Sequence, residues 1–153
     1  MKKSQRIKTI VDIKAKQEKN ALEALGAVQS RRLAMLGQIE GLKNYRKEYQ
    51  LRFEQLGSKG VSVPHLLEFR SFIDKLDKAI LGQEHQLNTI ELELKAKRKQ
   101  WEELHQKTQS LQKVCDSALV EEMKLEAKRE QMEQDERASR IGRNSNNGIG
   151  NAD

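Results

Sequence analysis

Proline occurs only once in this chain of 153 residues, at position 64. Since proline interrupts helices, long helices can run unbroken on both sides of that position. Aromatic residues make up 4% of the chain, and only 36% of its residues are hydrophobic. This composition is poor for a compact globular core, but it suits a pair of helices that each bury one apolar stripe. A single domain of this kind is expected from the length.

Cysteine is equally scarce. Cys115 is the only one, which excludes an intrachain disulfide and favours a reducing compartment. We interpret it as a small core residue, with thiol reactivity as the alternative. No apolar run approaches the roughly 18–20 residues of a membrane span, and the basic N-terminus is not followed by the apolar segment of a signal peptide. The sequence therefore predicts a cytoplasmic protein that reaches a membrane only through a partner.

Motifs for catalysis and for cofactor binding are missing as well. The chain has no phosphate-binding glycine loop, no dinucleotide fingerprint and no zinc-protease motif. Its three histidines, His65, His85 and His105, lie twenty residues apart, too far along one helix to share a metal ion. We therefore expect no catalytic residues, no metal site and no cofactor, and a function that depends on binding.

The chain does contain a sustained heptad repeat. Apolar residues alternate at spacings of three and four from Leu66 to Ala118, and thirteen of the sixteen core positions are apolar. A seven-residue repeat of this length predicts one helix supercoiled against another. The polar exceptions, Gln83, Lys97 and Thr108, either fix the register of the pair or mark places where it opens for a partner.

One strong break divides the chain, at residues 57–63. We predict one helix over about 4–56, ended by Gly57 as a left-handed C-cap, and a second over about 64–140. A loop this short makes the two helices antiparallel neighbours. Three glycines inside the first predicted helix are expected to permit close helix approach or local bending: Gly26, Gly37 and Gly41.

The second helix is expected to overhang the first. Pairing outward from the loop brings the first helix to its end near Cys115, and the heptad stripe decays just beyond, where Glu122 occupies a core position. Residues 141–153, rich in glycine and asparagine, are expected to form a disordered tail. The predicted fold class is therefore all-α, a long antiparallel two-helix coiled-coil hairpin over residues 1–140 with the second helix overhanging.

Positive charge is concentrated at one end of the chain. Of the formal net charge of +6, residues 1–19 contribute +5, from seven basic and two acidic side chains. Lys2, Lys3 and Arg6 begin this segment, which indicates either a solvated helix start or contact with an acidic partner. A second basic cluster, at residues 95–99, is flanked by glutamates, so a solvated face is favoured there over a nucleic-acid site.

The helix after the loop has more apolar residues than a hairpin seam requires. Phe72, Leu76 and Ala79 form a stripe at positions i, i+4 and i+7, tilted off the heptad seam. One alternative is that the stripe stays exposed and docks a partner. The other is that residues of the first helix fold over it: Tyr45, Tyr49, Leu51 and Phe53.

In order and spacing, the sequence resembles the flagellar export protein family FliJ, soluble components of the flagellar type III secretion apparatus. The resemblance covers about residues 5–137 and is carried by these pieces: Ile7–Glu18, Ala21–Gly26, Tyr45–Tyr49, the loop at 57–64, Phe69, Phe72–Ile80 and Trp101. It implies a non-enzymatic antiparallel coiled coil similar to the central stalk of rotary ATPases. It also implies a cytoplasmic protein that associates peripherally with the inner membrane through the export apparatus.

The resemblance implies three partners. The free-ended part would sit in the pore of the hexameric export ATPase, promote its assembly and stimulate hydrolysis. The helix after the loop would bind the membrane export-gate protein, and the chain would also bind empty export chaperones. The contacts would be made by two sets of residues: Lys2, Lys3 and Arg6 on the ATPase ring, and Phe72, Leu76 and Ala79 on the gate.

Three other functions fit the same pattern. The first is the equivalent stalk protein of a virulence type III secretion system. The second is a generic coiled-coil scaffold or holdase, which would bind many unfolded clients without an ATPase. The third is a nucleic-acid-binding arm, suggested by the pI of about 9.4, which would show a steep salt dependence; no nucleic-acid partner is expected, because the basic excess is confined mainly to one end.

Overall fold

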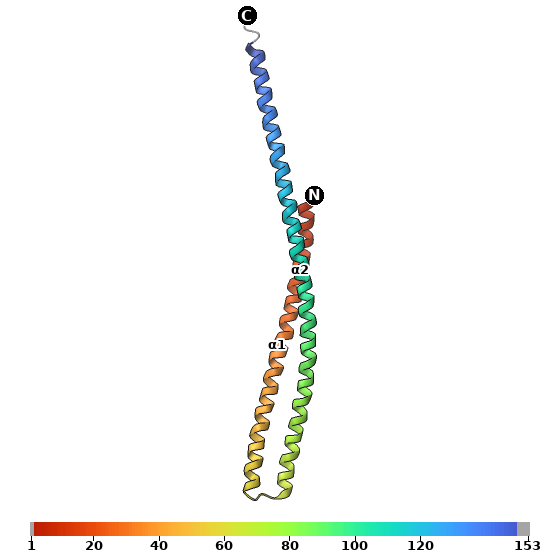
Figure 1. The fold of residues 1–153 in the computed structure, drawn as a ribbon, viewed down its shortest axis with the longest axis vertical. Coiled ribbons are helices and arrows are strands. Elements are labelled where there is room, and N and C mark those ends of the chain that lie inside the picture. Colours follow the sequence, from red (N-terminus) through yellow and green to blue (C-terminus); the bar gives the residue numbers. More distant parts are fainter. Residues whose placement is uncertain (1, 150–153) are drawn as a thin grey trace. The chain divides into compact units, whose positions relative to one another are not determined.

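The computed structural model describes residues 2–149, which form two α-helices. Helix α1 spans Lys3–Ser58 and helix α2 spans Val63–Ile149, and no strand occurs among the described residues (Figure 1). The all-α, two-helix fold predicted from the sequence is confirmed. The chain divides into two compact units. We call residues 16–105 the hairpin unit, and residues 2–15 together with 106–149 the terminal unit.

The turn of the hairpin unit is a Schellman motif centred on Gly60. This residue has φ +76°, and the N–H of Val61 donates to the carbonyl oxygen of Leu56 at 3.5 Å. That bond is the closing 6→1 bond of the motif, which places Gly60 at C′. The predicted cap at Gly57 is wrong, because α1 continues through Ser58 before the left-handed residue that glycine tolerates.

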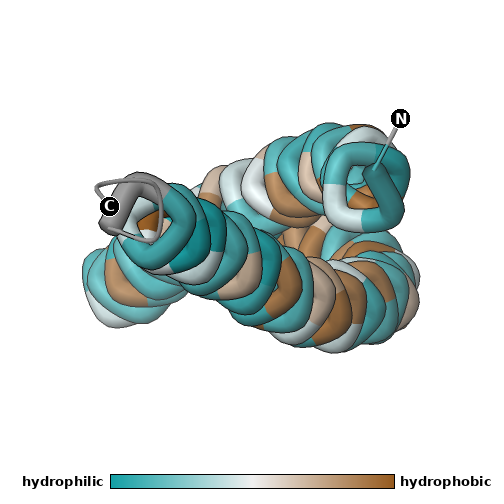
Figure 2. Tube along the Cα trace, turned by 90° about the horizontal axis from the view of Figure 1, so that it is seen from above, coloured by the Kyte–Doolittle hydropathy of each residue, from teal (hydrophilic) through white to brown (hydrophobic). Residues whose placement is uncertain are grey.

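Apolar residues at helical spacing fill the interface between α1 and α2 in the hairpin unit. Leu25 and Val28 of α1 pack with Leu94 of α2, and Ile90 and Trp101 pack against this cluster. Figure 2 shows that hydrophobic positions are interspersed with hydrophilic ones along both helices. Further buried residues of this unit continue the seam towards the turn: Ile39, Ile73, Leu76 and Ile80.

The glycines inside α1 do not permit close helix approach. A Cβ built on Gly26, Gly37 or Gly41 would meet no heavy atom within 4 Å. The predicted close contact is therefore wrong, because the helix interface is formed by the apolar residues and the glycines face open space. Their remaining effect is conformational, a cost of about 1 kcal/mol each relative to alanine.

Four ion pairs join α1 to α2 along the hairpin unit, and in each the cation is on α1 and the anion on α2. The pairs are Arg31–Glu93 at 2.7 Å, Lys43–Glu84 at 3.1 Å, Arg32–Glu91 at 3.4 Å and Arg46–Asp77. The hydrogen bond from Arg46 to Asp77 and the negative charge of Asp77 both raise the pKa of Arg46. Residue numbers rise on one helix as they fall on the other, which establishes the antiparallel arrangement within this unit.

The terminal unit is closed by a polar clamp at the start of α1. The Glu122 carboxylate accepts the Ser4 hydroxyl at 2.6 Å and the Ser4 backbone N–H at 3.0 Å. The Cys115 thiol donates to the Ser4 carbonyl oxygen at 3.6 Å. Ser4 and Cys115 are both buried, beside Val11 and Ala118. Cys115 is therefore a core residue. Glu122 supplies an acceptor for the Ser4 backbone N–H, one of the N–H groups that have no partner within a helix at its beginning, and for the Ser4 hydroxyl.

Helix α2 overhangs α1 beyond this clamp, as predicted. All residues from 123 to 147 are exposed. The helix does not end near residue 140, however, but continues to Ile149. The expectation of a disordered tail is thus corrected for residues 141–149, where no proline stops the backbone hydrogen-bond ladder; residues 150–153 lie outside the described residues.

Candidate functional site

The predicted gate-binding stripe does not form one exposed surface. Leu76 is only 7% exposed and lies in the hairpin seam, because it occupies a core position of the heptad repeat. Phe72 is half-buried and Ala79 is exposed. The structure therefore brings the three residues to the same segment of α2 but divides them between its buried and its solvent-facing sides.

Two tyrosines of α1 cover much of Phe72. Its ring centroid lies 4.5 Å from that of Tyr49 and 6.2 Å from that of Tyr45. Tyr49 also contacts Phe69, at 5.2 Å, so the four rings form one cluster beside the turn. Of the two alternatives predicted for this stripe, coverage by α1 therefore holds for the tyrosines, whereas Leu51 remains exposed.

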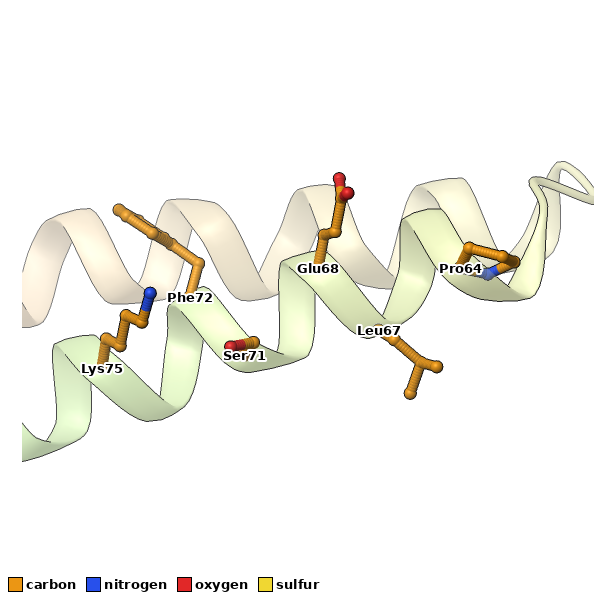
Figure 3. Close-up of a pocket in the computed structure, with 6 residues that line it drawn as sticks. All are labelled: Pro64, Leu67, Glu68, Ser71, Phe72 and Lys75. Carbon is orange, nitrogen blue, oxygen red and sulfur yellow. The ribbon is translucent and has the colours of Figure 1, made fainter.

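A shallow groove on α2 lies beside this aromatic cluster. Figure 3 shows its lining, with Leu67 and Phe72 leaving the helix on opposite sides. Leu67 is 60% exposed, which makes it the most accessible large apolar side chain of the groove. The full lining combines apolar walls with one acidic and one basic side chain: Pro64, Leu67, Glu68, Ser71, Phe72 and Lys75.

Leu67 belongs to the apolar segment after the loop but is not among the predicted site residues, because it falls outside the heptad series and outside the stripe of Phe72, Leu76 and Ala79. A signal was present, however, since Pro64, Leu67, Ser71 and Lys75 recur at helical spacing on one face of α2. The heptad pattern identifies residues that face the other helix, and a surface groove is formed by the residues between them.

The three basic residues predicted to meet the ATPase are all exposed at the start of the terminal unit. Lys2 lies in a groove with Glu122 and Glu126, and Lys3 lies in a second groove with Glu121. Lys2 and Lys3 thus lie close to carboxylates of α2. The groove at Lys2 also contains Arg129, so its two cations and two carboxylates balance. The groove at Lys3 also contains Lys113, so positive charge remains in excess there.

The Glu122 carboxylate is held in its ionised form. The hydrogen bond from the Ser4 hydroxyl lowers its pKa below the ordinary value of 4.5, with further lowering by the Ser4 backbone N–H and by the charge of Lys2. A carboxylate that accepts two hydrogen bonds prefers its charged form. The start of α1 is thereby fixed to α2 next to the basic residues.

Within residues 2–149, no group of three His, Cys, Asp or Glu side chains is placed to hold a metal ion. Neither helix, as far as it is described, has a stretch long and apolar enough to cross a bilayer. The third histidine of the sequence instead joins the helices, with His105 Nδ1 2.6 Å from Glu18 Oε1.

Comparison with known proteins gives one match. A family model described as "Flagellar FliJ protein" matches residues 2–147. No curated protein and no solved structure matches the chain. The matched range includes both the groove beside the turn and the basic start of α1.

Proposed function

Because the chain belongs to the FliJ family of flagellar proteins, we propose that it is a non-enzymatic, stalk-like component of the flagellar type III protein export apparatus. In this proposal it binds the pore of the hexameric export ATPase, promotes ring assembly and ATP hydrolysis, and links the ring to the export gate and to export chaperones. It works in the cytoplasm, held peripherally at the inner membrane by the apparatus. The family favours this function over a virulence secretion system or a generic scaffold.

The geometry of the terminal unit is the observation that carries the ring contact. Two helices lie side by side here, each about 10–12 Å across with its side chains, and α2 then continues alone with every residue from 123 to 147 exposed. A single helix that follows a helix pair is narrow enough for a ring pore. Its surface is mainly polar, with exposed apolar side chains at Met123, Leu125, Met132 and Ile141.

The charge of the N-terminus supports the same contact. Residues 1–19 carry +5, and Lys3 and Arg6 are exposed at the start of α1. Such a charge attracts an acidic pore lining and loses strength as salt screens it. Arg6 should contribute more than Lys2, because Lys2 shares its groove with Glu122 and Glu126.

The proposal is tested by charge reversal with a matched control. We expect the triple variant Lys2→Glu, Lys3→Glu, Arg6→Glu to bind the purified export ATPase more weakly and to stimulate hydrolysis less, with the largest difference at low salt. The control changes three exposed cations of the hairpin unit by the same total charge: Lys95→Glu, Arg98→Glu and Lys99→Glu. Equal affinity of the wild-type chain and the N-terminal variant would exclude the charges from the contact.

For the export gate, we propose docking in the groove beside the turn. Leu67 and Phe72 provide its apolar walls, and Leu67 is removable without opening the hairpin core. We expect Leu67→Gln to reduce binding to the cytoplasmic part of the gate protein, measured by calorimetry, while Leu81→Gln, at another exposed leucine of α2, leaves it unchanged. Leu76→Ala is unsuitable as a test, because it removes a buried side chain.

A further inference from the structure

Two exposed glycines of the hairpin unit lie at the same height along the helix pair, Gly41 on α1 and Gly82 on α2. The Arg46–Asp77 ion pair sets this alignment, because each glycine lies five residues beyond its member of the pair, on the side away from the turn. A second ion pair, nine residues beyond the two glycines, gives the same alignment. A Cβ added to either glycine would meet no heavy atom within 4 Å. Packing therefore does not require glycine on either helix at this height.

The backbone of α1 is open to water at the same place. Gly37 is helical and lies four residues before Gly41, so the α-helical hydrogen bond from the Gly41 N–H to the Gly37 carbonyl oxygen joins two glycines. Elsewhere in the helix, side chains cover such bonds, but glycine exposes the backbone. Compared with alanine, each glycine also favours the opening of its helical turn by about fivefold.

The seam between the helices contains an unsatisfied polar group at this height. Gln83 follows Gly82 and occupies the heptad core position after Ile80. Its side-chain oxygen Oε1 is buried and has no hydrogen-bond partner among residues 2–149. A buried amide oxygen without a donor favours any opening that lets water reach it. The ion pair beside it, Lys43–Glu84, is exposed, and such pairs add little stability.

We propose that these residues form a hinge, at which both helices of the hairpin unit bend together. We call it the glycine hinge, and define it by four residues: Gly37, Gly41, Gly82 and Gln83. When the hinge opens, water hydrates the glycine backbone and the Gln83 amide, while the buried seam is kept on each side. The groove at Leu67 lies between the hinge and the turn, so bending changes its direction relative to the cluster at Leu94. This inference does not depend on the proposed function.

Gly26 shows why the coincidence of several features matters. It also has no heavy atom within 4 Å of an added Cβ. However, its neighbours Leu25 and Val28 are buried against Leu94, and the residues of α2 at its height, 97 and 98, are not glycines. Gly26 therefore lies at a height where the seam is packed and only one helix carries a glycine, which makes it the matched control.

The first test measures amide hydrogen exchange along the full chain. In the wild-type chain, we expect amides of residues 41–45 and 82–86 to be less protected than those of residues 25–29. The double variant Gly41→Ala, Gly82→Ala should raise protection at the hinge by about fivefold for each replaced glycine. The control Gly26→Ala should leave protection at the hinge unchanged.

The second test detects bending itself, through residual dipolar couplings of α2 amides in a weakly aligned sample. A rigid helix gives couplings that fit one alignment on both sides of any point, whereas a hinge gives its two sides different alignments. We expect residues 64–80 and 84–100 to differ in the wild-type chain and to share one alignment in the double variant. Residues 84–93 and 95–104, which have no glycine between them, should share one alignment in both chains.

Three results would overturn the inference. Uniform protection and a single alignment in the wild-type chain would show that there is no hinge. Weak protection at the glycines with a single alignment would show local opening without bending. Lower protection in the double variant than in the wild-type chain would show that the glycines are needed for packing.

Discussion

The hairpin unit and the terminal unit use the same two helices in different ways. In the hairpin unit, apolar residues fill the seam and four ion pairs, each with its cation on α1, line the interface. In the terminal unit, two hydrogen bonds from Ser4 to Glu122 close the contact. Ile10, Ile13 and Val114 remain exposed there, as Leu33, Leu67 and Leu92 do in the hairpin unit. The two units therefore differ in what holds the helices together, an apolar seam lined by ion pairs in one and hydrogen bonds at the start of α1 in the other.

The order of charges in the hairpin unit also specifies which helices pair. Because the pairing cations lie on α1 and the anions on α2, an α1–α1 or an α2–α2 pair would bring like charges together. Surface ion pairs add little stability, so the shared orientation of these four Arg and Lys pairs matters more for specificity. The His105–Glu18 contact of the same unit has its carboxylate on α1 instead. In the terminal unit, the buried Ser4 specifies the register instead, because its hydrogen bonds to Glu122 form in only one alignment of the two helices.

The largest expected difference between the two units is in the free energy of unfolding that is lost when one leucine is removed from each. Leu94→Ala deletes a side chain of the central cluster in the hairpin unit, and we expect it to lower the free energy of unfolding by about 2–5 kcal/mol. Leu125→Ala removes an exposed side chain in the terminal unit, where a change within about 0.5 kcal/mol is expected. Urea unfolding followed by Trp101 fluorescence measures the first, and circular dichroism measures both. Equal losses of unfolding free energy would contradict the distinction between the packed seam at Leu94 and the exposed helix at Leu125.

A smaller effect is expected from glycine to alanine changes. Gly41 in the hairpin unit and Gly142 in the terminal unit are both helical, with nothing within 4 Å of an added Cβ. Gly41→Ala should raise the free energy of unfolding of the hairpin unit by about 1 kcal/mol. Gly142→Ala should raise helix content locally and leave the unfolding midpoint of Trp101 fluorescence unchanged. A lower midpoint for Gly41→Ala would show that this glycine is needed for packing or bending.

The smallest effect is a pH dependence confined to the start of α1. Since the pKa of Glu122 is lower in the folded chain than its ordinary value of 4.5, its contribution to stability is complete above that ordinary value and is lost as pH falls through the folded pKa. We expect hydrogen-exchange protection of the Ser4 amide to fall over that acidic range. Glu122→Ala should reduce it already at neutral pH, and the control Glu126→Ala should not. Protection that is independent of pH and of both changes would show that Glu122 does not cap α1.

Much of the fold followed from the sequence. Pro64 and the glycines before it marked the turn, and the heptad series contained the residues that became buried on α2, from Ile73 through Leu94 to Cys115. These features are local or periodic, so they are visible in one sequence. The overhang of α2 could be predicted as well, because both helices meet at the same turn and the second one is longer.

The remaining features depend on contacts between distant residues. Glu122 at a heptad core position suggested only that the stripe had decayed, but its carboxylate caps α1 from 118 residues away. Leu76 was assigned to a docking stripe by spacing, although its heptad position already predicted burial. The groove at Leu67 consists of residues outside the seam, and a pattern that identifies the seam does not show which of the other residues act together.

The stalk function is best tested by ATP hydrolysis of the purified export ATPase, with and without a stoichiometric amount of this chain, together with the oligomeric state of the ATPase. We expect faster hydrolysis and a shift from monomers to rings when the chain is present. Unchanged hydrolysis and no complex would contradict the stalk function, and would leave gate docking or chaperone binding as the functions of the same two helices.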